Sequence, residues 1–353
     1  MSDIPAYDQA AWGAIVTRRE AAMSPSAPGR VRTRARAVAA KVTRRAQEGV
    51  HAIPGGESFL EAFGTALSGL TDWSSEAAAT TVPRERIVRR LQKRGLTVNG
   101  LSDLRTVELR DLDRHRPRTK LAYTSTLAVE GAAAGFAISG GTALAAGGVV
   151  AGGVAAAPGA ALVVGALVTD TAAVLVGAQR AVSHIAAWYG YDTRDPAERL
   201  FALGVLGYGT ASAAGRAAAY GELSRLTQAL ARRAAWRQLD NSVVTQIVKR
   251  VFGLLGLRLT QRTLSKAIPV VGVVTGAGLN AWTIQRVHDA ADLLYRERWL
   301  MDRWGFEHAD ISTFIEDAVD RDEIIDLVDI VDAELEDPNH EDDANNKDDK
   351  GGT

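Results

Sequence analysis

Apolar residues recur along much of the chain at intervals of three and four, the spacing that places side chains on one face of a helix. The clearest run has Phe59, Phe63, Leu67 and Leu70 on one side. Runs in which apolar and polar residues alternate between turn pairs, the pattern of half-buried strands, are missing from the sequence. The pattern therefore predicts an all-α protein built as a multi-helix bundle.

Turn and capping residues give approximate bounds to several of these helices. We expect a first helix over residues 7–23, before a stretch rich in proline and serine, and a short basic helix over residues 83–94. Ser102 is the expected N-cap of the helix that follows. The apolar runs 200–208 and 268–279 are too short to cross a membrane, so we expect them to be core helices.

The segment between Glu130 and Asp170 contains no charged residue and consists mainly of Ala, Gly and Val. It is long enough for two antiparallel helices that reverse near Val150, so we expect a central Gly/Ala-rich helical hairpin. Small residues gain little from transfer into lipid, but they let helices approach closely inside a protein. The hairpin could therefore be buried in a membrane or in the protein itself. In both cases the carboxylates of Glu130 and Asp170 would lie at the same end.

Charge is distributed unevenly along the chain. Residues 1–120 carry 21 Lys and Arg against 13 Asp and Glu, residues 121–306 carry 17 against 11, and residues 307–353 carry 3 against 18. A basic body could meet an anionic surface, or the acidic C-terminal part could fold back and screen it. The interleaved aromatic and basic residues of a nucleic-acid platform are not seen, which favours a membrane surface over nucleic acid as the partner.

The sequence lacks the motifs of several common catalytic, metal-binding and cofactor-binding sites. The chain has no cysteine, which excludes disulfides and a cysteine nucleophile, and its six histidines are scattered, so we expect neither a metal nor a cofactor. Residues 276–281 fit a dinucleotide fingerprint, but Pro269 interrupts the strand that such a site needs, and we reject it. The N-terminus lacks the basic and apolar regions of a secretory signal, so a cytoplasmic location is expected.

Two stretches in the second half of the chain carry a recognisable motif pattern. Residues 170–206 begin with an acid, Asp170, that is expected to begin a helix, and continue to a Tyr-Gly-Tyr-Asp turn and an Asp-Pro-x-Glu-Arg helix start. Residues 260–300 hold a Lys-Ala-x-Pro-x-x-Gly motif, an asparagine and a closing Tyr-Arg-Glu-Arg helix. The residues that carry the pattern are Asp170, Tyr189, Gly190, Tyr191, Asp192, Asp195, Pro196, Glu198, Arg199, Lys266, Ala267, Pro269, Gly272, Asn280, Tyr295, Arg296, Glu297 and Arg298. With these motifs the chain resembles the EcsC-like family over about residues 100–304.

The resemblance implies a helical, membrane-linked bacterial protein, because the family's namesake is associated with an ABC transporter. It implies no established reaction. Charge and composition, together with the extent of the resemblance, divide the chain into a basic helical extension over residues 1–99, an EcsC-like helical core over 100–305, acidic helices over 306–337 and an acidic tail over 338–353 that we expect to be disordered.

Two sets of residues are candidates for a functional site. Glu130 and Asp170 are the candidate catalytic pair, because two carboxylates brought together shift each other's pKa or attract a cation. The candidate binding residues belong to the family motifs or are cations near them: Arg180, Tyr189, Asp192, Lys266, Asn280, Arg286 and Arg296. Capping and ion pairing are the simplest explanation for most of this second set, and contact with an anion is the alternative.

Three functions remain open at this point. The favoured one is a membrane-associated binding or regulatory protein that lies at the inner face of the membrane or inserts reversibly, with the hairpin docked on lipid or on a membrane protein, by family association an ABC transporter. The second is an enzyme that acts on a lipid or apolar substrate through Glu130 and Asp170. The third is a soluble scaffold that forms homo-oligomers through its small-residue helices.

Overall fold

The computed structural model describes residues 4–23, 82–117, 158–212, 215–232, 241–266, 274–307 and 325–336. Every regular element in these ranges is a helix, which confirms the all-α prediction. The elements are α1 (Ala6–Met23), α4 (Arg84–Gln92), the short 3-10 helix η1 (Ser102–Arg105), α5 (Leu109–His115), α8 (Pro158–Trp188), α9 (Pro196–Thr210), α10 (Arg216–Arg232), α11 (Asn241–Lys266), α12 (Val274–Trp304) and α14 (Leu327–Glu336).

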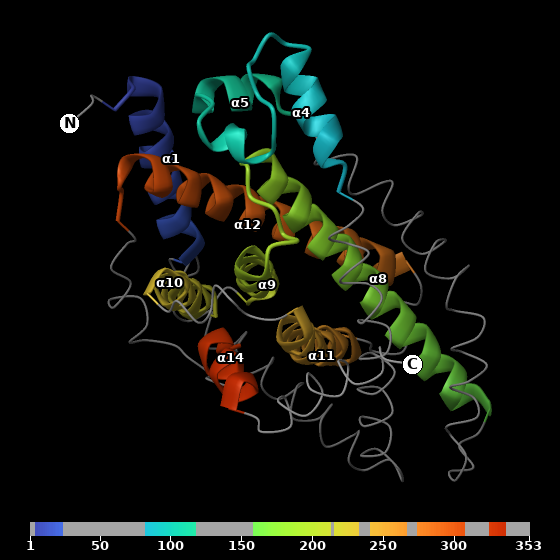
Figure 1. Ribbon diagram of the computed structural model, residues 1–353. Helices are drawn as coiled ribbons and strands as arrows, with labels where there is room; N and C mark the ends of the chain where they lie inside the picture. The colour runs from blue at the N-terminus through green and yellow to red at the C-terminus, as the bar shows by residue number, and fades with distance from the viewer. Residues whose placement is uncertain are drawn as a thin grey trace, which may run out of the picture.

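The centre of the bundle is α9, which is apolar on nearly all sides. Each residue from Leu200 to Leu206 is buried, as expected for a helix enclosed by others. Helices α8, α10, α11 and α12 pack around it (Figure 1). Gly209 brings α12 especially close, because a Cβ atom there would lie 2.8 Å from the Cα of Val287. The core helix expected over residues 200–208 is therefore confirmed.

Local signals in the sequence account for several helix ends. The Asp195 carboxylate accepts hydrogen bonds from the backbone N–H of Ala197, at 2.9 Å, and of Glu198, and Pro196 occupies the first turn of α9. Gly95 follows α4 with a φ of +85°, a backbone conformation that favours glycine. The helices expected over residues 7–23 and 83–94 are confirmed as α1 and α4.

The prediction for Ser102 is wrong. Ser102 is the first residue of η1 and makes no capping bond, and the expected single helix is divided into η1 and α5. The reason is local: the Asp103 carboxylate accepts bonds from the backbone N–H of Asn99, at 2.8 Å, and of Gly100, which holds a turn in front of η1. Glu108 then takes an extended conformation, with φ −65° and ψ 138°, and separates the two pieces.

Asp170 also differs from the expectation that it begins a helix. It lies inside α8, which starts at Pro158 and continues without interruption to Trp188. The residues around Asp170 include neither glycine nor proline, so nothing there breaks the helix. Glu130 and the first arm of the expected hairpin lie outside the described residues, and the hairpin stays a prediction. Within the ranges that the structure covers, no helix is both long and apolar enough to cross a membrane.

The acidic helix α14 packs on the basic body, as the sequence predicts for its part of the acidic region. It lies against α10 and α11 with Leu327 and Val331 buried, on the side of the bundle opposite α4 and α5 (Figure 1). Arg225 of α10 donates to Asp326 at 2.5 Å, and Arg250 of α11 pairs with Glu334 at 3.3 Å. Residues 308–324 and the tail expected to be disordered, 338–353, lie outside the described residues.

The contact between α10 and α14 predicts a stability that depends on pH. Burial, together with the negative charge of Asp326, raises the pKa of Glu222 to about 7 although Arg225 acts against this. The unfolded chain ionises Glu222 from about pH 4.5, so the stability that Glu222 contributes is full below that pH and is lost as the pH rises through 7.

Glu222→Gln should therefore raise the free energy of unfolding by about 1 to 3 kcal/mol near pH 8 and leave it almost unchanged near pH 4. Urea unfolding at both pH values measures the difference. The exposed Glu85→Gln is the matched control and should change neither value. A Glu222→Gln variant that is less stable than the parent near pH 8 would contradict the prediction.

Candidate functional site

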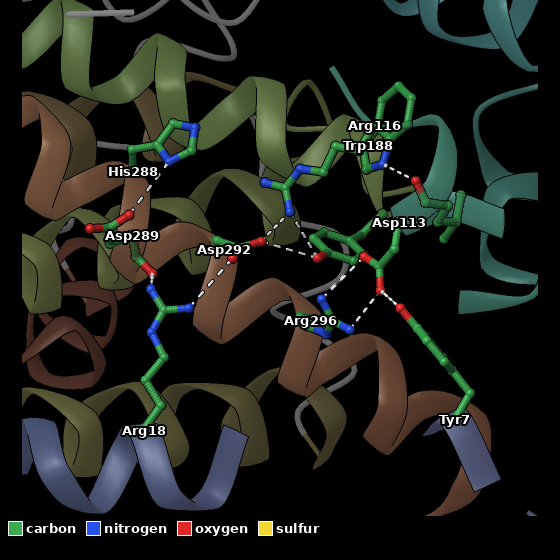
Figure 2. Close-up of polar contacts among 11 residues, drawn as sticks. Tyr7, Arg18, Asp113, Arg116, Trp188, His288, Asp289, Asp292 and Arg296 are labelled. Carbon is green, nitrogen blue, oxygen red and sulfur yellow. Dashed lines mark hydrogen bonds and ion pairs between the residues drawn. The ribbon is translucent and has the colours of Figure 1, made fainter. Parts of the chain in front are cut away.

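One polar network joins the N-terminal part of the chain to α8 and α12 (Figure 2). We call it the Asp292 network; it consists of Asp113, Arg116, Tyr189, Asp292 and Arg296. Arg116 donates to Asp292, and the Tyr189 hydroxyl donates to the same carboxylate at 3.1 Å. The Arg296 guanidinium donates two hydrogen bonds to the Asp113 carboxylate, at 2.6 and 3.1 Å. The network therefore holds α5, the turn after α8 and α12 together.

Residues of α1 close this network on one side. The Tyr7 hydroxyl donates to Asp113 at 2.8 Å, and Arg18 pairs with Asp292 at 3.5 Å and donates to the Asp289 carbonyl. Burial would raise the pKa of Asp292, but the charge and hydrogen bond of Arg116, together with the charges of Arg18 and Arg296, outweigh it and hold that pKa below its ordinary value. Asp292 is thus an ionised carboxylate surrounded by guanidinium groups, and it has no spare capacity to act as a general acid near neutral pH.

A second network joins the two family motifs directly. Arg298 donates to both carboxylate oxygens of Glu198, at 2.7 and 2.8 Å, in the fork geometry of a bidentate pair. The Arg298 guanidinium also lies over the rings of Tyr191 and Phe201, at 4.5 and 4.4 Å from their centroids. The Tyr191 hydroxyl donates to Asp302 at 2.7 Å. These contacts join the motif at the start of α9 to the motif at the end of α12.

A third polar cluster is almost fully buried between α1, α10 and α12. Arg19 is 3% exposed and Glu297 1%, and the two form an ion pair. The Tyr220 hydroxyl donates to the same Glu297 carboxylate at 2.8 Å. Buried charges of this kind persist only when they are paired and hydrogen-bonded, so this cluster fixes α1 in its place.

The chemistry of these networks is structural. Their carboxylates are each bound by an arginine, and among the residues that the structure describes no group of three metal-ligating side chains comes together. His184 lies close to this region, but burial and then the charges of Arg116 and Arg180 lower its pKa to about 4. His184 is therefore neutral near physiological pH.

A different kind of surface lies on α4. Ile87, Val88 and Leu91 anchor one side of this helix in the core, while the opposite side is exposed and basic. We call this exposed side the α4 basic face. It consists of Arg86, Arg89 and Arg90 of α4 together with Lys93 and Arg94, which directly follow the helix.

Next to the α4 basic face is a pocket of about 460 Å³, which we call the Arg84 pocket. Arg84 of α4 and Arg194, from the turn between α8 and α9, both donate to the Asp192 carboxylate, at 2.8 and 2.6 Å. Burial would raise the pKa of Asp192, but the two arginines lower it. The full lining is Arg84, Glu85, Val88, Arg89, Gln92, Asn99, Gly100, Leu101 and Arg194.

The structure distributes the predicted site residues over several places. Tyr189 and Arg296 share the Asp292 network, and Asp192 lies behind the Arg84 pocket. Arg286 donates to the Ala211 carbonyl at 2.5 Å and lies over the half-exposed ring of Trp282. Arg180 is half-buried on α8.

The remaining predicted site residues cannot be compared with the geometry. The side chains of Asp170, Lys266 and Asn280 lie outside the described part of the chain, as does the whole of Glu130. The prediction that these residues form a site is therefore untested.

Sequence reasoning did not select the pocket arginines Arg84, Arg89 and Arg194. The available signals were the basic character of residues 83–94 and the position of Arg194 two residues after Asp192. Neither signal shows that the two segments meet, because they are about a hundred residues apart and only the folded bundle brings them together.

Comparison with known proteins fits the motif pattern. Residues 145–300 match the model of the EcsC protein family. The chain is 29% identical over 126 residues to the uncharacterized protein YdbA of Bacillus subtilis (strain 168), a match that covers 35% of this chain and 43% of YdbA. No solved structure shows significant similarity. The two family motifs that Glu198 and Arg298 join lie within the matched range, and residues 145–300 of this chain are therefore a region of the EcsC protein family.

Proposed function

We propose that this protein is a membrane-associated binding or regulatory protein that contacts an anionic membrane surface through the α4 basic face. The observation that carries the proposal is the arrangement of α4, whose apolar side is anchored in the core while the five residues of the α4 basic face are exposed to solvent. A folded helix that presents cations in this way attracts anionic headgroups without unfolding. The location that follows is the inner face of a bacterial membrane.

The position of α14 supports the same proposal. Helix α14 lies on the side of the bundle opposite α4 (Figure 1), and Asp326 and Glu334 are paired there with Arg225 and Arg250. These acids therefore do not cover the α4 basic face. No comparable observation supports the enzyme alternative, because Glu130 and the Asp170 side chain lie outside the described residues.

The proposal predicts that a single charge reversal on α4 weakens membrane binding. Each basic side chain near an anionic surface contributes about 1 kcal/mol, so Arg90→Glu should lower the affinity for phosphatidylglycerol vesicles roughly tenfold or more. Vesicle pelleting of the full chain measures this, and raised salt should release the parent protein. Pure phosphatidylcholine vesicles should not bind it.

The matched control is Arg232→Glu, which makes the same charge change at an exposed position at the end of α10. It should leave binding close to that of the parent protein. Equal losses in the two variants would mean that net charge alone controls binding. A parent protein that does not pellet with anionic vesicles at low salt would refute the proposed function.

A further inference from the structure

The Arg84 pocket differs in shape and in donor arrangement from the rest of the basic surface. An exposed helix face attracts any anion, whereas a concave site with several guanidinium groups selects an anion with several oxygens. Arg84 and Arg89 come from α4, and Arg194 comes from the turn after α8. Two distant segments of the chain thus supply cations to one pocket.

Asp192 positions two of these cations. It is a single ionised carboxylate that accepts hydrogen bonds from both Arg84 and Arg194 and holds the two guanidinium groups beside the pocket. Within the described part of the chain, Arg194 engages this carboxylate through Nε and Nη2 only. Its Nη1 group keeps its donors for a ligand, because a guanidinium carries five N–H bonds.

The third cation is held loosely. Arg89 pairs with Glu85 at 3.4 Å, one turn away on α4, and the two side chains are 64% and 89% exposed. An exposed pair of this kind contributes little to stability, so Arg89 can turn toward a ligand at small cost. Val88 and Leu101 add an apolar part to the lining.

We infer that the Arg84 pocket binds a phosphate monoester, with Arg194 and Arg89 contacting the phosphate oxygens and Val88 and Leu101 contacting the organic part. A terminal phosphate presents three oxygens and up to two negative charges, which suits guanidinium groups from two directions. The volume of about 460 Å³ exceeds the size of a bare oxyanion and lies in the range of small-molecule sites, so it leaves room for an organic body.

Both a lipid headgroup and a soluble molecule can present a phosphate monoester. A phosphate monoester lipid headgroup would make the pocket the selective part of the proposed membrane surface, and in this form the inference rests on the proposed function. A soluble phosphate ester would occupy the pocket without any membrane. The test therefore has a vesicle arm and a soluble arm.

In the vesicle arm, the full chain is pelleted with phosphatidylcholine vesicles that contain phosphatidic acid, a monoester, or phosphatidylglycerol, a diester, at matched surface charge. The parent protein should bind the monoester vesicles at least about tenfold more tightly, the effect of one additional charged hydrogen bond. Arg89→Ala/Arg194→Ala should remove this preference. Arg86→Ala/Arg90→Ala removes the same charge from the α4 basic face and should lower both affinities while it keeps the preference.

In the soluble arm, glycerol 3-phosphate is titrated into the same three proteins by calorimetry, and the pocket variant should again lose binding at least about tenfold. Vesicle binding with no preference for the monoester, and no binding of glycerol 3-phosphate, would overturn the pocket inference and leave the proposed function standing. Glycerol 3-phosphate binding that depends on Arg194, without vesicle binding, would support the pocket and refute the membrane surface. Failure of every probe would overturn both.

Discussion

Arg298→Ala is expected to lower the free energy of unfolding by about 2 to 4 kcal/mol, because it leaves the half-buried Glu198 carboxylate without its bidentate partner. The truncation also removes the guanidinium from the rings of Tyr191 and Phe201. Arg298→Lys should recover only part of the loss, since an ammonium group cannot form the same fork or stack on an aromatic ring. Chemical denaturation of the three proteins measures the series.

A double variant tests whether the loss of stability comes from leaving the Glu198 carboxylate unpaired. In Glu198→Gln/Arg298→Leu the Glu198 carboxylate is removed together with its cation, and only the exposed Asp302, 3.9 Å from Arg298, loses an ion-pair partner. This protein should therefore be more stable than the single variant Arg298→Leu. The exposed Arg110→Ala serves as the control and should change stability by less than about 0.5 kcal/mol. If Arg298→Ala unfolds at the same denaturant concentration as the parent, the two family motifs are not held together by this pair.

Gly190→Ala should destabilise the protein by about 2 to 4 kcal/mol, because two separate costs combine at this position. Gly190 has a φ of +86°, and a Cβ atom there would lie 3.0 Å from the backbone nitrogen of Arg105 and from the backbone oxygen of Leu101. Backbone atoms cannot move aside as a flexible side chain can. The substitution should therefore push η1 and its flanking turns away from the end of α8.

Gly95→Ala provides a matched comparison that isolates the cost of the close backbone contact at Gly190. Gly95 has nearly the same φ, +85°, but nothing lies within 4 Å of the position of its Cβ. Gly95→Ala should therefore lower the free energy of unfolding by only about 1 kcal/mol, the cost of placing alanine in the left-handed backbone conformation. Thermal unfolding of both variants gives the difference, which measures the contact of the turn with Leu101 and Arg105. Equal losses in the two variants would show that this contact has no energetic weight.

The parts of the fold that sequence reasoning predicts correctly depend on neighbouring residues. The start of α9 follows from Asp195 and Pro196, and the end of α4 is marked by Gly95, so each signal acts within one helical turn. The prediction for Ser102 failed within the same range, because Asp103 was the better acceptor for nearby backbone N–H groups and formed a turn instead. Competition between adjacent polar side chains is hard to resolve without the backbone geometry.

The partners in the polar networks could not be paired from the sequence. Arg296 and Arg298 both belong to one motif, yet Arg296 binds Asp113, 183 residues away, and Arg298 binds Glu198, 100 residues away. On a helix these two arginines point in different directions, and only the packing of α12 decides which carboxylate each one meets. Asp192 and Arg296 nevertheless form ion pairs, as the simplest interpretation expected, and Tyr189 donates a hydrogen bond to the Asp292 carboxylate.

The packing of α1 has a consequence for the order of events during synthesis. Trp12 stacks on Phe306, and the Trp304 indole N–H donates to Asp8 at 2.7 Å, so the partners of α1 lie 294 and 296 residues further along the chain. A ribosome releases α1 long before it has made the end of α12. The contacts of α1 with Asp113 and Tyr220 can form earlier, but the first helix cannot complete its packing until almost the whole bundle exists. Complete docking of α1 is then a late step of folding, and a nascent chain that stops before residue 274 has no part of α12 to receive it.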